Sequence, residues 1–352
     1  DTEIFQIKLR SMHVSLITVD ESHCISQWGY DFRPAYLKIA DIRQLLPGVP
    51  VIALTATATP EVVSDIQQRL QFRQENVFRM SFERKNLAYV VRHTEDKESE
   101  LLYILQRVNG SGIVYTRNRK KTKEISLFLN RNHITATFYH AGLNDETKDS
   151  RQKAWLKGEF RVMVATNAFG MGIDKSDVRY VIHYNMPKDL ESYYQEAGRA
   201  GRDGLPSSCI LLFSGQDVRT GEFLITHGEP REELDAKTAE LLRERDLQRL
   251  RRMTAYCRTQ RCLRQYLLQY FGEFASDYCG ACYNCLHNFE EVDVSREAQI
   301  IVRCVAELGQ HFGVGVVAET LCGADTEKIR KFHMEREPSY GLLKDLTQVQ
   351  VR

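Results

Sequence analysis

Short, continuous apolar runs alternate with amphipathic stretches through residues 1–215 of this chain. The apolar runs are rich in β-branched residues and lie at Val14–Val19, Val51–Leu54, Ile113–Tyr115, Val162–Ala165, Val181–Tyr184 and Cys209–Phe213. Such runs are typical of strands that are buried on both faces of a parallel sheet. Because helical periodicity lies between them, as at Lys97–Arg107 and Thr122–Asn130, we predict an α/β fold with its chemistry in loops after the strands.

Two changes in this pattern predict boundaries. The periodicity lapses at Phe72–Asn86, which indicates a division between two lobes, and the strand pattern stops after Phe213. Helical patterns follow at Glu232–Cys257, Ala298–Leu308 and Thr326–Phe332. On the first of these helices, an apolar stripe recurs at Leu247, Leu250, Met253 and Cys257. We therefore predict four segments, at residues 1–78, 79–215, 216–290 and 291–352.

Composition adds little to this picture. The 352 residues are 43% hydrophobic and 27% charged, as in an ordinary globular protein. No apolar run approaches the roughly 20 residues that a membrane-spanning helix needs, so we expect no contact with a membrane. The opening DTEIFQIKLR lacks a secretory signal and a methionine, and we expect that the natural N-terminus lies further upstream.

Charge and cysteine are unevenly distributed. Eight arginines lie between Arg243 and Arg264, a cluster that suits phosphate groups, although a solvated helix face explains it equally well. Four of the nine cysteines, at Cys262, Cys279, Cys282 and Cys285, have the spacing of tetrahedral thiolate ligands for Zn²⁺. A redox or disulfide role is the competing interpretation. We expect Cys257 to pack rather than ligate, and Cys24, Cys209, Cys304 and Cys322 to be small buried hydrophobes.

Two adjacent acids follow the first apolar run, at Asp20 and Glu21. A carboxylate at a strand end can hold Mg²⁺, and its neighbour can orient a water for attack on a γ-phosphate. A second strand runs into the hydroxyl-rich loop ALTATAT at Ala53–Thr59, whose hydroxyls can relay hydrogen bonds from a phosphate site. A plain small-residue turn is the alternative for this loop.

The string QEAGRAGRDG at Gln195–Gly204 places Arg199 and Arg202 three residues apart, between glycines. At helical spacing the two guanidinium groups would share one face, which suits stabilisation of a transferring phosphoryl group. A salt-bridged turn is the competing interpretation.

These strings occur in the order of the motifs of superfamily-two helicases, with Thr166–Asp174 (TNAFGMGID) between the second and the last. The stretch DESHCISQWGYDFRPAYLKI resembles the RecQ family of DNA helicases in particular. The cysteine spacing resembles the zinc subdomain of that family, and Ser295–Lys331 resembles the opening of its winged-helix module. The resemblance implies two RecA-like parallel-sheet lobes, the first incomplete, then a helical zinc-binding subdomain and the start of a winged helix.

The resemblance also implies roles for residues. Catalytic residues would be Asp20, Glu21, His23, Arg199 and Arg202, and ATP would contact Asp20, Glu21, Gln195, Arg199 and Arg202. DNA would contact Trp28, Phe32, Arg33, Thr166 and Asn167, because aromatic rings stack on bases without regard to sequence. The competing interpretation is that these aromatics fill an interface between lobes.

As a whole, the resemblance implies an ATP-dependent 3′-to-5′ DNA helicase of recombination and repair. The implied cofactors are ATP, Mg²⁺ and Zn²⁺. The implied partners are single-stranded DNA, forks or duplex junctions, a single-stranded-DNA-binding protein and repair proteins. The expected location is the bacterial cytoplasm, at the nucleoid, or the nucleus of a eukaryote.

The chain departs from the family pattern in three places. No glycine-rich loop with Lys-Ser or Lys-Thr occurs in it, and the nearest candidate, NGSGIVY at Asn109–Tyr115, has no lysine. Ser22 stands where alanine is usual, and Tyr30 stands where histidine is frequent. We expect that the chain is a fragment. The alternatives are a non-hydrolysing, zinc-containing DNA-binding or scaffold protein, and an RNA helicase.

Overall fold

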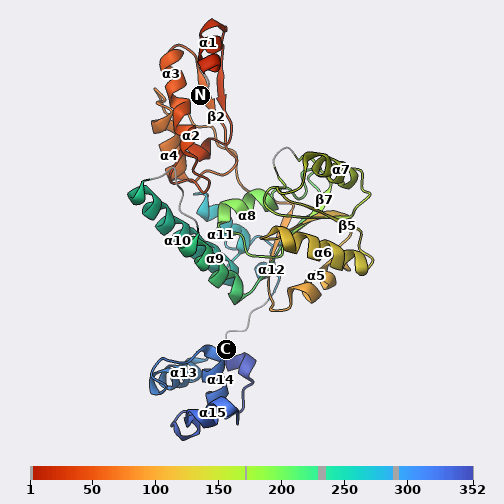
Figure 1. Cartoon of the computed structure of the whole chain (residues 1–352), viewed down its shortest axis with the longest axis vertical. Coiled ribbons are helices and arrows are strands. Elements are labelled where there is room, and N and C mark those ends of the chain that lie inside the picture. Colours follow the sequence, from red (N-terminus) through yellow and green to blue (C-terminus); the bar gives the residue numbers. More distant parts are fainter. Residues whose placement is uncertain (1–2, 171–172, 229–234, 288–292, 352) are drawn as a thin grey trace. The chain divides into compact units, whose positions relative to one another are not determined.

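The computed structural model describes residues 3–170, 173–228, 235–287 and 293–351. The chain forms two compact units, Asp1–Asn288 and Phe289–Arg352. The first unit contains two parallel sheets and a group of helices that follows them, and the second contains helices (Figure 1). Among the described residues, no helix combines the length and the apolar character that are needed to cross a membrane.

A two-stranded parallel sheet forms the first lobe, with β1 (Ile17–Val19) beside β2 (Val51–Ala53). Around it lie α1 (Glu3–Ser11), α2 (Pro34–Leu37), α3 (Ile42–Leu45) and α4 (Pro60–Arg69). Helix α4 begins with a proline at its first turn and packs Val62 and Ile66 against Val19 and Ile25.

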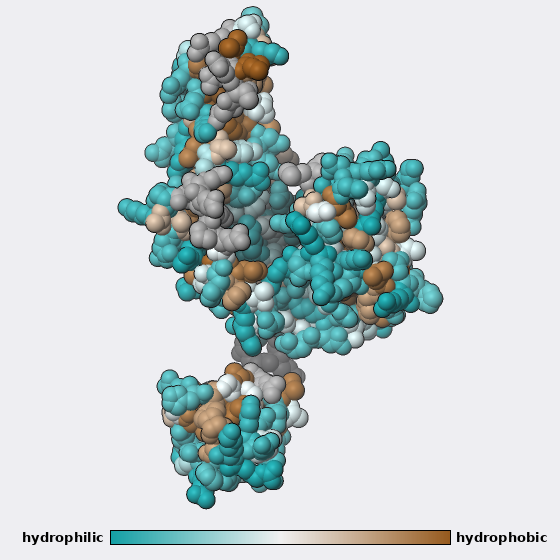
Figure 2. Space-filling view, viewed as in Figure 1, coloured by the Kyte–Doolittle hydropathy of each residue, from teal (hydrophilic) through white to brown (hydrophobic). Residues whose placement is uncertain are grey.

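We predicted that these strands would be buried on both faces, and that prediction is wrong for this sheet. The side chains of Ile52 and Leu54 are 45% and 48% exposed, because the described residues cover only the other face. Exposed apolar side chains also gather on α1, at the top of the molecule as drawn in Figure 2, where Ile4 and Ile7 lie.

Irregular backbone links Leu70 to Asn86, as the lapse in periodicity predicts. The second lobe then forms a six-stranded, all-parallel sheet in the order β3-β8-β7-β4-β6-β5. Its strands are β3 (Leu87–His93), β4 (Ser111–Tyr115), β5 (Ala136–Tyr139), β6 (Val162–Ala165), β7 (Val178–His183) and β8 (Ser207–Phe213). Its helices are α5 (Lys97–Leu105), α6 (Arg119–Arg131), α7 (Asp145–Leu156) and α8 (Leu190–Ala197). The parallel α/β fold that the pattern predicts is therefore confirmed.

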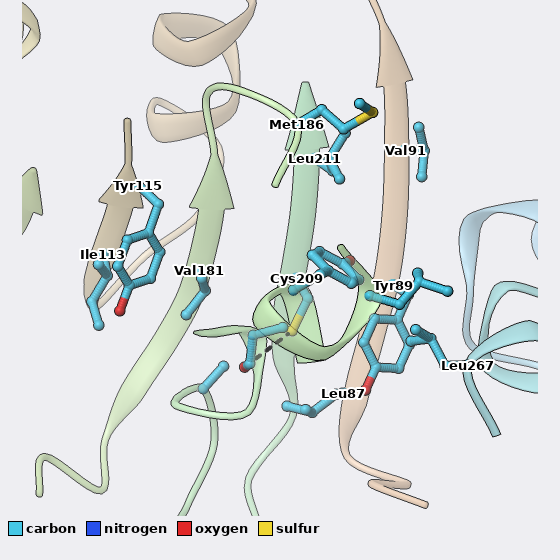
Figure 3. Packing of buried hydrophobic residues seen from close by; sticks show 14 of the residues in the cluster. Leu87, Tyr89, Val91, Ile113, Tyr115, Val181, Met186, Cys209, Leu211 and Leu267 are labelled. Carbon is cyan, nitrogen blue, oxygen red and sulfur yellow. Dashed lines mark hydrogen bonds between the residues drawn. The ribbon is translucent and has the colours of Figure 1, made fainter. Parts of the chain in front are cut away.

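Two apolar clusters cover the faces of this sheet. One joins Leu101, Ile125 and Leu129 of α5 and α6 to alternate strand residues. The other extends from the sheet into the helices that follow, and Figure 3 shows Tyr89, Cys209 and Leu267 within it. Because this cluster is continuous, the second lobe and the following helices share one core.

Those following helices are α9 (Gly215–His227), α10 (Ala236–Arg258), α11 (Leu263–Tyr270) and α12 (Tyr283–Leu286). Helix α9 begins with a capping box, in which Ser214 and Asp217 satisfy each other's backbone N–H groups. The buried Lys97 ammonium donates to Asp217 and to the carbonyl oxygens of Tyr184 (3.0 Å) and Leu212 (2.9 Å). This ion pair fixes the start of α9 on the second lobe.

The second unit is a small helical body with α13 (Ser295–Glu307), α14 (Val314–Leu321), α15 (Glu327–Lys331) and α16 (Gln348–Val351). Its core includes Cys304, Leu321, Ile329 and Met334. Cys322, which we expected to be buried, is only half-buried, and its thiol donates to the carbonyl of Leu346 at 3.5 Å.

Candidate nucleotide and DNA site

Asp20 and Glu21 lie where β1 ends, at the carboxyl edge of the first sheet. Asp20 is exposed, and its Oδ1 accepts the backbone N–H of Glu21 at 2.8 Å. Glu21 has a left-handed backbone, with φ 47° and ψ 42°, which is uncommon for a residue with a side chain. Such strained residues cluster at functional sites, where the surrounding structure holds them.

The surroundings of Glu21 alter its acidity. Burial raises the pKa of Glu21 above its usual value, and the negative charges of Asp20 and Asp31 raise the pKa further. The positive charges of Arg33 and Arg199 lower the same pKa.

His23 is buried beside this pair. Its Nδ1 lies 3.0 Å from Thr55 Oγ1 and 3.3 Å from Glu21 Oε2. Burial lowers the pKa of His23 to about 4, so the ring is neutral at neutral pH. Thr55 comes from the hydroxyl-rich loop, so this loop contacts the residue that follows the two acids by two positions.

The aromatic-rich loop, residues 24–33, follows directly. Trp28 is 52% exposed, and the guanidinium of Arg33 pairs with Asp31 at 2.6 Å on the surface. Phe32 is only 7% exposed, so it offers no face to a base in this conformation. Cys24 is buried, as expected, and burial raises the pKa of its thiol to about 12.

The second lobe supplies the other half of the site from the loop after β6 and the turn after α8. Asn167 is exposed beyond the end of β6, whereas Thr166 is buried. Met171 and Gly172 of the same motif lie outside the described residues.

Arg199 and Arg202 do not share a helical face, because α8 ends at Ala197 and Gly201 has a positive φ of 56°. A side chain at Gly201 would meet the Leu205 carbonyl at 2.8 Å, so the turn requires glycine. Arg199 donates to the carbonyl of Gly170, and its Nε is buried without a partner among the described residues. Arg202 donates to Ile173 O at 2.9 Å and to Asp174 Oδ1 at 3.3 Å.

A direct contact joins the two lobes. Tyr30 donates its hydroxyl hydrogen to Gln195 Oε1 at 3.1 Å, and Gln195 Nε2 lies 3.5 Å from Glu21 Oε1. Gln195, which the sequence singles out, therefore lies between the aromatic-rich loop and the acid. Tyr30 makes this contact from the position where the family often has histidine.

Pattern reading missed a cavity of about 470 Å³ at the carboxyl edge of the second sheet. Its lining includes the polar side chains of Arg117, Asn167 and Lys188 and the apolar side chains of Leu224 and Leu242. Arg117 and Lys188 follow the carboxyl ends of β4 and β7. Their position after parallel strands could have predicted that they belong to a binding site. The string NGSGIVY instead contains the whole of β4, with its glycines at the amino end of the strand and Gly112 against the Tyr180 ring.

Four thiols gather beyond α11. The sulfur atoms of Cys262, Cys279, Cys282 and Cys285 all lie within 4.8 Å of one another. Each sulfur accepts a backbone N–H at 3.3–3.4 Å, a hydrogen bond that favours the thiolate. This donor set fits a tetrahedral structural Zn²⁺ site. Cys257 is buried in the apolar core instead, as we expected.

The arginine cluster divides into two groups. Arg264 is buried and donates to the carbonyls of Lys85 (3.1 Å) and Leu87 (2.9 Å), and Arg249 is buried as well. Arg251 and Arg252 are exposed on α10. The cluster is therefore neither wholly a solvated face nor wholly available to phosphate.

We predict that the purified chain contains about one zinc ion, bound by four thiolates that tie the start of α11 to α12 and the loop before it. A Cys282→Ser change should release the zinc and lower the melting temperature, because structural zinc contributes directly to folding free energy. Cys257→Ala is the matched control, and it should retain the metal. Metal analysis of freshly purified, reduced protein checks both, and absence of zinc there would refute the site.

Comparison with known proteins agrees with this geometry. Residues 96–204 match the helicase conserved C-terminal domain, residues 215–286 the RecQ zinc-binding domain, and residues 288–352 the RQC domain. The ATP-dependent DNA helicase RecQ of Bacillus subtilis is 45% identical over 338 residues, which are 96% of this chain and 56% of that protein. RecQ of Pasteurella multocida is 36% identical over 94% of this chain and 51% of that protein. The chain thus spans about half the length of these relatives.

Among solved structures, Saccharomyces cerevisiae Dbp5 bound to RNA and ADP BeF3 superposes with a TM-score of 0.50. It is 16% identical and covers 69% of this chain and 67% of that one, so the likeness concerns the fold alone. The RecQ-specific zinc and RQC regions, together with the relatives' identity over nearly the whole chain, carry the assignment. This chain belongs to the RecQ family of helicases.

Proposed function

We propose that the chain is part of an ATP-dependent DNA helicase that moves 3′ to 5′ and unwinds duplex DNA in recombination and repair. One observation carries the proposal: Glu21 Oε1 of the first lobe lies 3.5 Å from Gln195 Nε2 of the second lobe, four residues before Arg199 in the chain. An acid that can activate water thus lies beside the segment of the opposite lobe that carries an arginine able to stabilise charge. Phosphoryl transfer requires an acid that positions the attacking water and a positive charge that stabilises the transferring phosphoryl group.

The residues present fit a Mg²⁺-nucleotide in three respects. Asp20 is an exposed carboxylate, Glu21 is an acid held in a strained backbone, and Arg199 has a buried N–H group that finds no partner among the described residues. Asp20 would hold the metal, and Gln195, Arg199 and Arg202 would contact the phosphates. When bound, Mg²⁺ would supply charge neutralisation at the phosphate oxygens. The raised pKa of Glu21 suits a group that accepts a proton from water.

DNA would contact the exposed residues Trp28 of the first lobe and Asn167 of the second. Trp28 exposes a ring on which a base can stack, and Arg33 and Asn167 are exposed polar groups suited to a strand backbone. Such contacts ignore base sequence, as a motor requires. We further propose action on chromosomal DNA, in a bacterial nucleoid or a nucleus, beside single-stranded-DNA-binding and repair proteins.

The test uses an ATP-hydrolysing protein that contains this chain. Trp28→Ala should lower the stimulation of ATPase activity by single-stranded DNA, because base–aromatic stacking is worth about 1–3 kcal/mol per base. The rate without DNA is the internal reference. Phe274→Ala is the control, since Phe274 is an exposed aromatic outside the loop. Equal losses with and without DNA would show that Trp28 is structural.

The same assay separates the alternatives. Stimulation by RNA but not by DNA would indicate an RNA helicase. Absence of hydrolysis, with zinc present and DNA bound, would favour a scaffold protein. The lack of a P-loop in this chain supports that alternative. Unwinding of duplexes with a 3′ but not a 5′ single-stranded tail would establish the polarity.

A further inference from the structure

The aromatic-rich loop belongs to the first lobe, yet an arginine of α10 holds its backbone. Arg249 Nη2 donates to the carbonyl oxygens of Trp28 (2.7 Å) and Gly29 (2.9 Å). Its Nη1 donates to Asp246 Oδ1 at 2.8 Å, which balances the charge of a side chain that is only 8% exposed. An unpaired buried charge costs free energy. The hydrogen bonds and the ion pair of this buried guanidinium therefore hold it in one position.

A second arginine, one helical turn earlier, holds the indole. Arg245 Nη1 donates to the carbonyl of Gln27 at 2.9 Å, and its guanidinium carbon lies 3.7 Å from the centre of the Trp28 ring. Residues four apart share a helix face, so both arginines reach the same loop. The guanidinium covers one face of the indole and leaves the ring half exposed.

Helix α10 is itself fixed to the second lobe. Leu250, Met253, Tyr256 and Cys257 are buried in the core that α10 shares with the six-stranded sheet. The ring of His93 on β3 also contacts the carbonyl of Cys257 at 2.8 Å. The polar face of α10 therefore contacts the first lobe, while its apolar face is fixed to the second.

The other end of the loop leads to the nucleotide site. Lys188 donates to the carbonyl of Tyr30 at 3.0 Å, and the Tyr30 ring stacks on His23 with centroids 4.6 Å apart. Tyr30 also contacts Gln195, which adjoins Glu21. A continuous set of contacts thus runs from α10, through the loop, to the acid.

We propose that α10 couples the aromatic-rich loop to the second lobe, with Arg249 and Arg245 as its positioning residues. Because the loop is covalently part of one lobe and hydrogen-bonded to groups fixed on the other, any relative movement of the lobes must strain or shift it. The proposal rests on the proposed function for its consequence, since the loop is where DNA would be sensed. Three of the four hydrogen bonds from these arginines go to backbone carbonyls of the loop. These bonds depend on the backbone conformation of the loop and not on its side chains.

The placement of the loop can be tested without any catalytic assay. The chain has two tryptophans, Trp28 and Trp155, and Trp155 is fully buried, so quenching by acrylamide reports mainly on Trp28. Arg249→Gln should release the loop and raise the quenching constant about twofold, since the ring would go from 52% exposed toward full exposure. Arg245→Gln should do the same by uncovering one face of the indole.

Arg251→Gln is the matched control, because it removes the same charge from an exposed position on the same helix. Zinc content and melting temperature check the fold of each variant. If Arg249→Gln proves unfolded, the half-buried Arg245 decides the result. Unchanged quenching in the folded variants would overturn the proposal, because the loop would then hold its place without α10.

The functional arm compares ATPase rates with and without single-stranded DNA. Arg249→Gln should abolish the stimulation, and adding Trp28→Ala to it should cause no further loss. Altered quenching with normal stimulation would overturn the coupling. If the unsubstituted protein itself shows no DNA-stimulated turnover, the proposed function fails, and the quenching arm still decides the placement of the loop.

Discussion

An Arg202→Ala change should lower kcat for ATP hydrolysis by on the order of 10³ or more, while nucleotide affinity changes little. The physical reason is that an arginine across the cleft stabilises charge that develops mainly in the transition state. Its removal therefore raises the barrier without removing much ground-state binding. Turnover and nucleotide binding, measured separately in an ATP-hydrolysing protein that contains this chain, check the prediction. Binding of single-stranded DNA should persist.

The structure adds a control and a comparison. Arg202 donates to Ile173 O and Asp174 in the resting arrangement, so we expect it to exchange these partners as it engages the nucleotide. Arg199, whose charge already acts on Glu21, should support it, and Arg199→Ala should also lower kcat. Arg179→Ala is the control, because Arg179 pairs with Asp203 on the same turn. Loss of nucleotide binding on Arg202→Ala, or unchanged turnover, would refute the assignment across the cleft.

Continuous β-branched runs predicted six of the strands, namely β1 and β2 of the first lobe and the four inner strands of the six-stranded sheet. The inner strands must be apolar on both faces, which makes their runs continuous. The two strands that the pattern missed lie at the edges of the six-stranded sheet, β3 and β5. In β3, buried residues alternate with half-buried ones, and Arg92 interrupts the apolar run. The edge strands of this six-stranded sheet are less continuously apolar than its inner strands, so their signal is weaker.

Only part of the candidate site could be predicted from the sequence. The acids and the cysteines could be singled out because each belongs to a local string with a chemical reason for its spacing, whereas the glutamine was implied by the family resemblance. The turn at Gly201 could not be foreseen from arginines three residues apart, since only the left-handed glycine and the end of α8 decide it. Likewise, a list of arginines cannot show that Arg249 serves a loop more than 200 residues away in the sequence.

Replacing Glu21 by glutamine should lower the rate of ATP hydrolysis by roughly 10²–10⁴, the usual contribution of a positioned general base. Glutamine keeps the shape and an oxygen that can accept from Gln195, but it cannot accept a proton from the attacking water. Nucleotide and DNA binding should therefore be retained, and a single-turnover measurement should locate the loss in the chemical step.

The control for this substitution is Glu98→Gln, which removes a carboxylate that pairs with Lys121 at 2.7 Å on the surface of the second lobe. It should leave turnover unaltered. Glu21 has a left-handed backbone conformation that glutamine tolerates no better, so the backbone strain is the same in both proteins and the comparison isolates the carboxylate. Turnover by Glu21→Gln at the rate of the unsubstituted protein would mean that another group activates the water, and the position of Glu21 beside the second lobe would then have no role in the chemistry.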